Sequence, residues 1–190
     1  MPPQSKAEAG RRALEVRSEI GLGPFEPLDP RVLAREYGIP IFTVTGLSSC
    51  PRETVAHLTG GGQGAFSAAL VPLGTCLFIV ENDAHTDARR RASLAHEMAH
   101  VVWEHRFTEV LVNEDGCRAA DPDAEEEADR LGNELLVPNR AAVAAAKNGW
   151  ADEEVAQTYG VSVPYARMRM NRSGARKIVQ RAAARHSGVG

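Results

Sequence analysis

The run His96-Glu97-Met98-Ala99-His100 places two imidazoles four residues apart, with a carboxylate between them. On an α-helix, residues i and i+4 lie on one face about one turn apart, so both rings can bind a single metal ion. Glu97 would lie beside that ion, where it can take a proton from the water that fills the remaining coordination position. This arrangement is typical of zinc hydrolases.

The segment around this run has the pattern of a half-buried helix. Leu94, Met98, Val101 and Val102 recur at helical spacing, and neither Pro nor Gly interrupts residues 87–107. The alternative is a pair of core histidines with an exposed glutamate between them. We favour the metal site, because two histidines and a glutamate buried without a metal would need several hydrogen-bond partners.

A zinc site with two histidines needs a third protein ligand. Downstream, Asp121 and Pro122 have the residue types expected at the start of a helix. Glu125 and Asp129 lie four residues apart on this predicted helix, so Glu125 can bind the metal while Asp129 hydrogen-bonds the far nitrogen of a ligating histidine. Alternatively, the acidic run Glu125–Glu127 serves only to interact favourably with the dipole at the start of the helix. Both interpretations can hold, since only one of the three carboxylates must face the metal.

Three blocks of the sequence carry a family resemblance. They are an R-x-x-x-A-H-E-x-x-H helix (91–100), an E-x-x-A-D/N helix that ends in L-L-x-P (126–138) and a short helix that ends in Y-G-I (33–39). Together they resemble the ImmA/IrrE family of zinc-dependent metallopeptidases. In the family pattern the metal-binding glutamate stands four residues before the D/N position and thirteen before the proline, which selects Glu125. The sequence departs from the pattern at Gly132, where a small alanine is usual.

The predicted function is a zinc-dependent endopeptidase with one Zn²⁺ per chain. His96, His100 and Glu125 are the predicted metal ligands, and Glu97 is the predicted general base. The resemblance implies cleavage of a partner protein, typically a helix-turn-helix transcriptional repressor, which would derepress stress-response or mobile-element genes.

Two alternatives remain open. The first is a DNA-binding regulator or toxin–antitoxin component with a structural or vestigial metal site. Glu97 argues against it, because a structural site has no need of a general base. The second is a zinc hydrolase that acts on a non-peptide amide, whose ligands would be identical.

Composition indicates a cytoplasmic protein without a membrane segment. The 190 residues, 43% of them apolar, are enough for one domain with a core. A net charge of -3 argues against a general nucleic-acid binder. Three cysteines at no metal-like spacing indicate reduced thiols, and no apolar run has the length of a membrane helix. Cys76 lies in an apolar, strand-like run and is expected in the core.

The remaining segments predict an α+β fold, in which a small, mainly antiparallel sheet packs on a zinc-binding helical core with a helix-rich C-terminal part. The expected helices cover 7–20 and 29–38, and the expected strands cover 40–45, 65–71 and 75–80, the last two as a hairpin. Residues 55–58 are expected as a short strand or a turn. One of the two hairpin strands is the candidate edge that holds a substrate as an added strand.

The predicted domains are a disordered N-terminus (1–6), a metallopeptidase domain (7–150) and a C-terminal helical extension packed on it (151–190). Within the extension, two helices joined at Gly160 have the pattern of a helix-turn-helix, and arginines on the second helix make DNA contact conceivable. We favour packing against the catalytic core over DNA binding, because similar helices complete the catalytic domain of the family that the chain resembles.

Three further side chains are candidates for holding an oxyanion, a task that zinc peptidases usually give to a His, Tyr or Arg. They are Tyr159, Tyr165 and His105. His105 is the weakest of them, because five residues after His100 it would point roughly 140° away on a continuous helix. The other histidines, at positions 57, 85 and 186, are expected on the surface.

Overall fold

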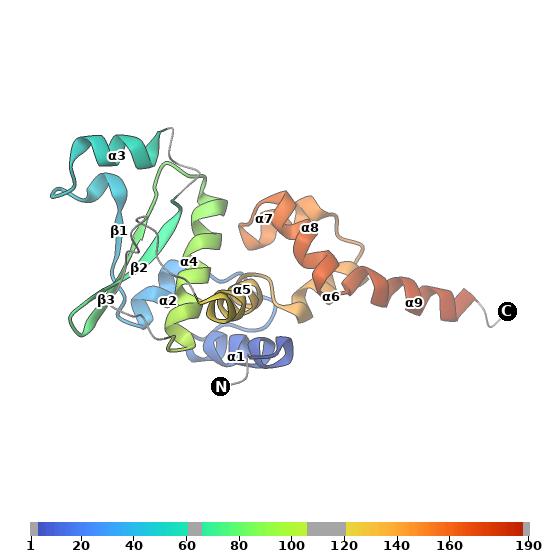
Figure 1. The fold of residues 1–190 in the computed structure, drawn as a ribbon. Coiled ribbons are helices and arrows are strands. Elements are labelled where there is room, and N and C mark those ends of the chain that lie inside the picture. Colours follow the sequence, from blue (N-terminus) through green and yellow to red (C-terminus); the bar gives the residue numbers. More distant parts are fainter. Residues whose placement is uncertain (1–3, 61–65, 106–120, 188–190) are drawn as a thin grey trace.

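A three-stranded sheet stands beside a group of packed helices, so the predicted α+β fold is confirmed (Figure 1). The computed structural model describes residues 4–60, 66–105 and 121–187, with side chains up to residue 181. In this part the elements are α1 (Lys6–Glu19), α2 (Pro30–Glu36), β1 (Ile41–Thr43), the 3-10 turn η1 (Val44–Gly46), α3 (Arg52–Thr59), β2 (Ala68–Leu73), β3 (Cys76–Glu81), α4 (Asp87–Val102), α5 (Pro122–Leu136), α6 (Asn139–Lys147), α7 (Asp152–Tyr159), α8 (Val163–Arg172) and α9 (Ala175–Ser187).

The sheet is mixed, with the strand order β1-β3-β2. β2 and β3 form the expected hairpin, closed by a tight turn in which Gly74 has a φ of 61°. β1 pairs with β3 in parallel. The longer pairing, between β2 and β3, is antiparallel, so the expectation of a small, mainly antiparallel sheet is confirmed. The parallel pair arises because a long connection through α3 and β2 separates β1 from β3 and brings the chain back in the same direction.

Residues 55–58, expected as a strand or a turn, lie in the helix α3. Val55 and Leu58 are three residues apart, which is helical rather than strand spacing, and the Thr59 hydroxyl donates to the Val55 carbonyl at 2.8 Å. α3 contains no fully buried residue, so the sequence carried little packing signal there. Most of the glycine-rich stretch 60–64, together with residues 106–120, lies outside the described residues.

The helices α4 and α5 pack against each other at the centre of the molecule. On one side, a cluster of buried apolar side chains joins them to the sheet, α1 and α2; it includes Leu33, Leu70, Ile79, Leu94 and Met98. On the other side, a second cluster joins them to the C-terminal helices and includes Ala95, Leu136, Val155 and Met170. Burial of each large apolar side chain contributes roughly 1.5–3 kcal/mol, so both helices are held from two sides.

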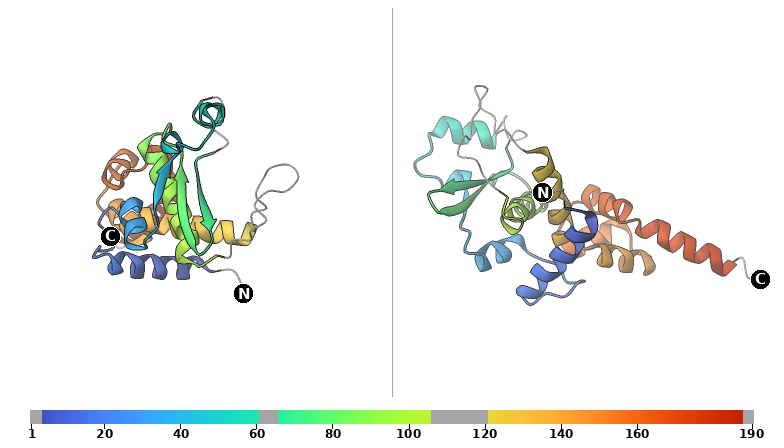
Figure 2. Two further views of the ribbon diagram at one scale, coloured as in Figure 1. Left: turned by 90° about the vertical axis from the view of Figure 1, so that its left-hand side faces the viewer. Right: turned by 60° about the horizontal axis from the view of Figure 1, so that its bottom comes forward.

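The predicted helix-turn-helix is present as α7 and α8. Gly160 ends α7 with a φ of 63°, and the Ser162 side chain accepts from the Tyr165 N–H at the start of α8. Figure 2 shows α9 leading away from the rest of the molecule. Within the described residues, no helix has the length and apolar character needed to span a membrane. The predicted boundary near residue 150 stays a prediction.

Two expectations about burial were wrong. Cys76 is exposed, because it begins β3 directly after the hairpin turn. His85 is buried, with its Nε2 3.0 Å from the Phe66 carbonyl oxygen. His57 is exposed on α3 as expected. Cys117 and the side chain of His186 lie outside the described part of the chain.

Candidate metal centre

Three side chains from two helices meet at one point. α4 supplies His96 and His100, α5 supplies Glu125, and one donor atom of each lies within 4.8 Å of the other two. His96 Nε2 lies 3.1 Å from His100 Nε2 and 3.1 Å from Glu125 Oε2. Two imidazole nitrogens and one carboxylate oxygen form a donor set that suits zinc and leaves a coordination position for water.

The two helices come unusually close together at Gly132. A Cβ atom there would lie 3.1 Å from the Ala95 carbonyl oxygen and 3.2 Å from the His96 backbone nitrogen. Contacts this short are tighter than side chains normally make, so the missing side chain is what allows the approach. The approach in turn brings Glu125 and Asp129, earlier on α5, within reach of His96.

Asp129 holds the ring of His96 from behind. Its Oδ1 lies 3.0 Å from His96 Nδ1, which leaves Nε2 directed at Glu125 and His100, as the sequence predicts. Burial of the His96 ring acts to lower its pKa, but the hydrogen bond with Asp129 and the nearby Glu97 and Glu125 outweigh burial and leave that pKa raised. The same hydrogen bond lowers the pKa of Asp129.

His100 is held by a second chain of contacts, which the sequence did not reveal. Its Nδ1 lies 2.8 Å from His105 Nδ1, and His105 Nε2 lies 3.0 Å from Glu127 Oε2. Glu127 Oε1 in turn accepts the backbone N–H of Gln4 at 2.5 Å. With His100 Nε2 facing Glu125, the chain is consistent if His100 donates to His105 and His105 donates to Glu127.

The predicted direction of His105 was wrong because α4 ends at Val102. Glu104 then adopts a left-handed conformation with a φ of 53°, and the His105 N–H donates to the His100 carbonyl. The chain therefore turns back, and the His105 ring returns to His100. Neither Gly nor Pro marks this end of the helix, so its position could not be predicted from the residues.

Glu97 is buried beside β2. Its Oε2 accepts the Leu70 N–H at 2.9 Å. In an antiparallel pair only alternate residues bond to the partner strand, so Leu70 and its alternates Ala68 and Pro72 turn their backbone groups away from β3. Pro72 has no N–H to leave unpaired, which suits an outer strand. In the described part of the chain, β3 is paired on both sides, whereas the outer edge of β2, next to Glu97, carries no strand.

A cavity of about 300 Å³ lies at this place, between β2, α4, α5 and α8. His96, Glu97 and Tyr165 are among the residues that line it. Burial raises the pKa of Tyr165, which keeps its hydroxyl protonated. The other tyrosine candidate, Tyr159, donates its hydroxyl to the Phe25 carbonyl at 3.0 Å and does not line the cavity.

Two arginines on α8 make contacts within the molecule. Arg169 is buried and donates to the Val137 carbonyl at 2.6 Å and to Glu134 at 2.7 Å. Arg167 donates to Asp152 at 2.9 Å. These contacts fix the position of α8 against α5 and α7.

Comparison with known proteins agrees with the resemblance seen in the sequence. A family model, Peptidase_M78, described as the IrrE N-terminal-like domain, matches residues 66–171. The match includes β2, β3, α4 and α5 and all three candidate ligands. The search of curated proteins found no match. Because the family model covers more than half of the 190 residues, this chain belongs to the IrrE N-terminal-like peptidase family.

Proposed function

We propose that this protein is a zinc-dependent endopeptidase that holds one Zn²⁺ through His96, His100 and Glu125. The observation that carries the proposal is the convergence of their donor atoms within 4.8 Å, next to the buried carboxylate of Glu97. The donor set fits zinc, and both imidazoles are oriented from behind by hydrogen-bonded groups, as metal-ligating histidines usually are.

Glu97 is the proposed general base. A bound zinc ion would polarise the scissile carbonyl and lower the pKa of a neighbouring water molecule. Glu97 takes the proton from that water and passes it to the leaving amine. The hydrogen bond from the Leu70 N–H holds its carboxylate beside β2. Tyr165, which lines the same cavity, is suited to donate its hydroxyl to the oxyanion.

The substrate chain is proposed to bind as an added strand along β2. Ala68 lines the cavity that contains Glu97 and turns its backbone groups away from β3, while the Leu70 N–H on the same edge donates to Glu97. An extended peptide paired with this edge would pass in front of the candidate metal centre. This is the mode of binding expected of a peptidase that cuts within an extended segment.

The proposed partner is a helix-turn-helix transcriptional repressor, cleaved in the cytoplasm, whose loss would derepress stress-response or mobile-element genes. The family resemblance supports this partner. The contacts of Arg167 and Arg169 within the molecule favour a protein substrate over a role of α8 in DNA binding.

The test compares metal content and hydrolysis in matched variants. The wild type should carry about one zinc per chain. Glu97→Gln should keep the zinc and lose hydrolysis of the partner by at least roughly 10³-fold, because the amide cannot accept the proton. Glu125→Ala should lose the zinc, whereas Glu126→Ala, whose side chain bonds Arg130 instead, should keep it. A fully active Glu97→Gln variant, or zinc loss in Glu126→Ala equal to that in Glu125→Ala, contradicts the proposal.

A further inference from the structure

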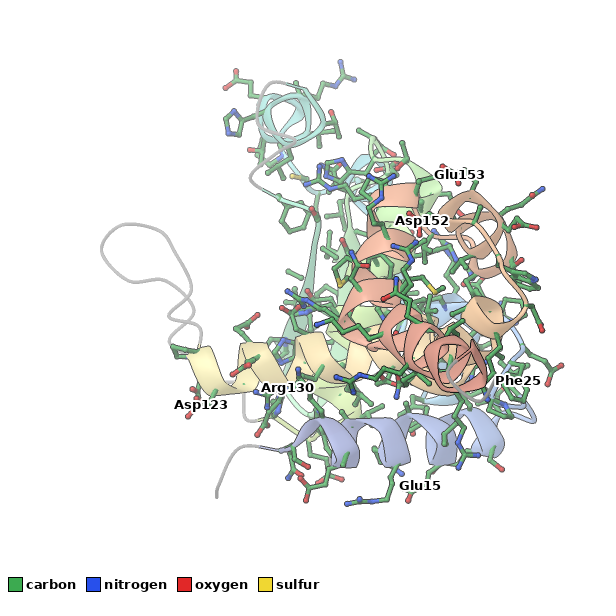
Figure 3. The ribbon with its side chains drawn as sticks, turned by 90° about the vertical axis from the view of Figure 1, so that its right-hand side faces the viewer. Glu15, Phe25, Asp123, Arg130, Asp152 and Glu153 are labelled. Atoms are coloured by element: carbon green, nitrogen blue, oxygen red, sulfur yellow. The ribbon has the colours of Figure 1, made fainter. Side chains whose placement is uncertain are left out.

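A second and larger groove lies on another side of α5. Its volume is about 810 Å³, and it is lined by the first half of α1, by α5, by the start of α6 and by the end of α8. Figure 3 shows α1 running beneath α5, with Arg130 at their junction. Asp129 and Asn133 line both this groove and the cavity beside the candidate metal centre. The groove and the cavity are therefore neighbours across one face of α5.

The lining of this groove carries an excess of positive charge. Two of its arginines are neutralised within the molecule: Arg130 bonds Glu126 at 2.5 Å, and Arg169 bonds Glu134 at 2.7 Å. Four further cations, all exposed, form no salt bridge with any described residue; they are Lys6, Arg11, Arg140 and Arg172. The remaining acid of the lining, Asp129, is bonded to His96.

These four cations converge from distant parts of the chain. Lys6 and Arg11 come from α1, Arg140 comes from α6, and Arg172 comes from α8. A solvated face of a single helix would not produce this arrangement. α1 packs on α5, and α8 packs on α6, so the cations of α1, α6 and α8 come together on one concave surface. A concave surface concentrates the field of the charges that line it.

We propose that this groove binds an acidic segment of the substrate protein, adjacent to the bond that is cut. The proposal rests on the proposed function, because the groove continues from the cavity that contains Glu97. Its volume lies in the range of pockets that bind ligands, and is large enough for several side chains of a bound peptide. A peptide with acidic residues would pair with the four cations and would associate faster and more tightly at low ionic strength.

A nucleic acid suits the groove less well than a peptide. Its lining includes the carboxylates of Glu126, Asp129 and Glu134. The phosphates of a nucleic acid follow each other at close and fixed intervals, so some of them would face these carboxylates. A peptide can place its acidic side chains opposite the cations alone.

The experiment measures peptide binding without catalysis. Fluorescein-labelled dodecapeptides with alternating Glu-Ala, Gln-Ala or Lys-Ala are titrated with the metal-free full-length Glu97→Gln protein, and binding is followed by fluorescence anisotropy. The Glu-Ala peptide should bind at least roughly tenfold more tightly than the Gln-Ala peptide at low salt, and added salt should weaken it. The Lys-Ala peptide should bind no better than the Gln-Ala peptide.

Charge reversal locates the site. Adding Arg140→Glu and Arg172→Glu should weaken binding of the Glu-Ala peptide by roughly tenfold. The matched control adds Arg35→Glu and Lys147→Glu, which change the net charge equally at exposed positions outside the groove. The control should stay within about twofold of the parent. Thermal unfolding of each variant verifies that it is folded.

Three outcomes overturn the proposal. They are equal binding of the acidic and neutral peptides, equal loss in the two double variants, and a short DNA duplex that binds more tightly than the acidic peptide and displaces it. Since the protein used is inactive and metal-free, failure of the peptidase proposal would leave this result unchanged. Acidic-peptide binding in the groove together with a wild type that has no hydrolytic activity would reject the proposed function and retain the groove.

Discussion

At the scale of single residues, each histidine of the candidate metal centre is oriented by a carboxylate. Asp129 contacts His96 directly, and Glu127 acts on His100 through His105. A ring held in this way keeps one nitrogen aimed at the metal and one proton on the other nitrogen. The affinity for the proposed zinc should therefore depend on residues that do not bind it.

The contacts that run from His100 through His105 to Glu127 can be tested by substitution. His105→Ala and Glu127→Ala should each weaken zinc binding roughly 10- to 100-fold, because the ring of His100 loses its orientation. Glu127→Gln should retain most of the affinity, since its amide oxygen still accepts the proton of His105. Competition with a chromophoric chelator measures the affinity, and the absorption spectrum of the Co²⁺ form reports the ligand geometry. Glu127→Ala with wild-type affinity would show that the contact has no such role.

The affinity for the proposed zinc should also depend on pH. Burial acts to lower the pKa of His96, but the hydrogen bond with Asp129 and the charges of Glu97, Asp129 and Glu125 together raise it above its ordinary value of 6.5. Protonated His96 cannot bind metal, so zinc affinity is complete above this raised pKa and falls as the pH drops through it. Asp129→Asn removes one of the charges that raise the pKa of His96, so the fall in zinc affinity should begin at a lower pH. Zinc affinity measured between about pH 5 and 8 tests this, and identical profiles would contradict it.

The sequence predicted the residues whose positions follow from helical spacing alone. His96, His100, Glu125 and Asp129 sit one turn apart in pairs, and the two pairs face each other once the helices pack. His105 could not be placed in this way. Its position depends on the end of α4 and on the left-handed conformation of Glu104, which neither Gly nor Pro announces.

At the scale of elements, the close approach of α4 and α5 at Gly132 positions the site. Gly132→Leu should destabilise the protein by about 1–3 kcal/mol through overpacking, and should also lower its zinc content by moving Glu125 away from His96. Urea unfolding and elemental analysis give the two readouts.

Gly10 on α1 provides the matched control. The nearest atom to an added Cβ there is 3.9 Å away, which is ordinary contact. Gly10→Ala should therefore leave the zinc content unchanged and stabilise the protein by up to about 1 kcal/mol, through the better helix propensity of alanine. A Gly132→Leu variant as stable as the wild type, with full zinc content, would mean that the close approach of α4 and α5 does not depend on Gly132.

The sequence predicted helices most accurately where caps and apolar spacing coincide. α5 begins at Pro122 after the cap of Asp121, as expected. α3 was not expected, because it contains no fully buried residue and so has no core contact to stabilise it. The hairpin was predicted from its turn residues, whereas the parallel pairing of β1 depends on contacts between segments distant in the sequence.

At the scale of the whole molecule, Arg169 ties the C-terminal helices to the helix that carries Glu125. Arg169→Ala should destabilise the protein by about 3–5 kcal/mol, because Glu134 and the Val137 carbonyl lose their partner in a buried place. Arg167→Ala on the same helix breaks a pair whose arginine is 61% exposed, and should cost at most about 1 kcal/mol. Equal effects in urea unfolding would contradict this difference.

The class of the fold could be predicted from the order of its elements, since a strand hairpin followed by a series of helices indicates α+β. The placement of α1 could not. α1 packs on α5 and lines the larger groove, the one that carries the four exposed cations. This packing joins residues more than a hundred positions apart.

The contact between Gln4 and Glu127 has a consequence for how the protein is prepared. The backbone at position 4 is the outer end of the hydrogen-bond chain that holds His100. A polyhistidine purification tag fused ahead of residue 4 would place extra metal-binding imidazoles beside the contacts that hold His100. The zinc content measured afterwards would then no longer report on the native ligands alone. α9 leads away from the rest of the molecule (Figure 1), so a removable tag placed beyond it would leave the zinc measurement interpretable.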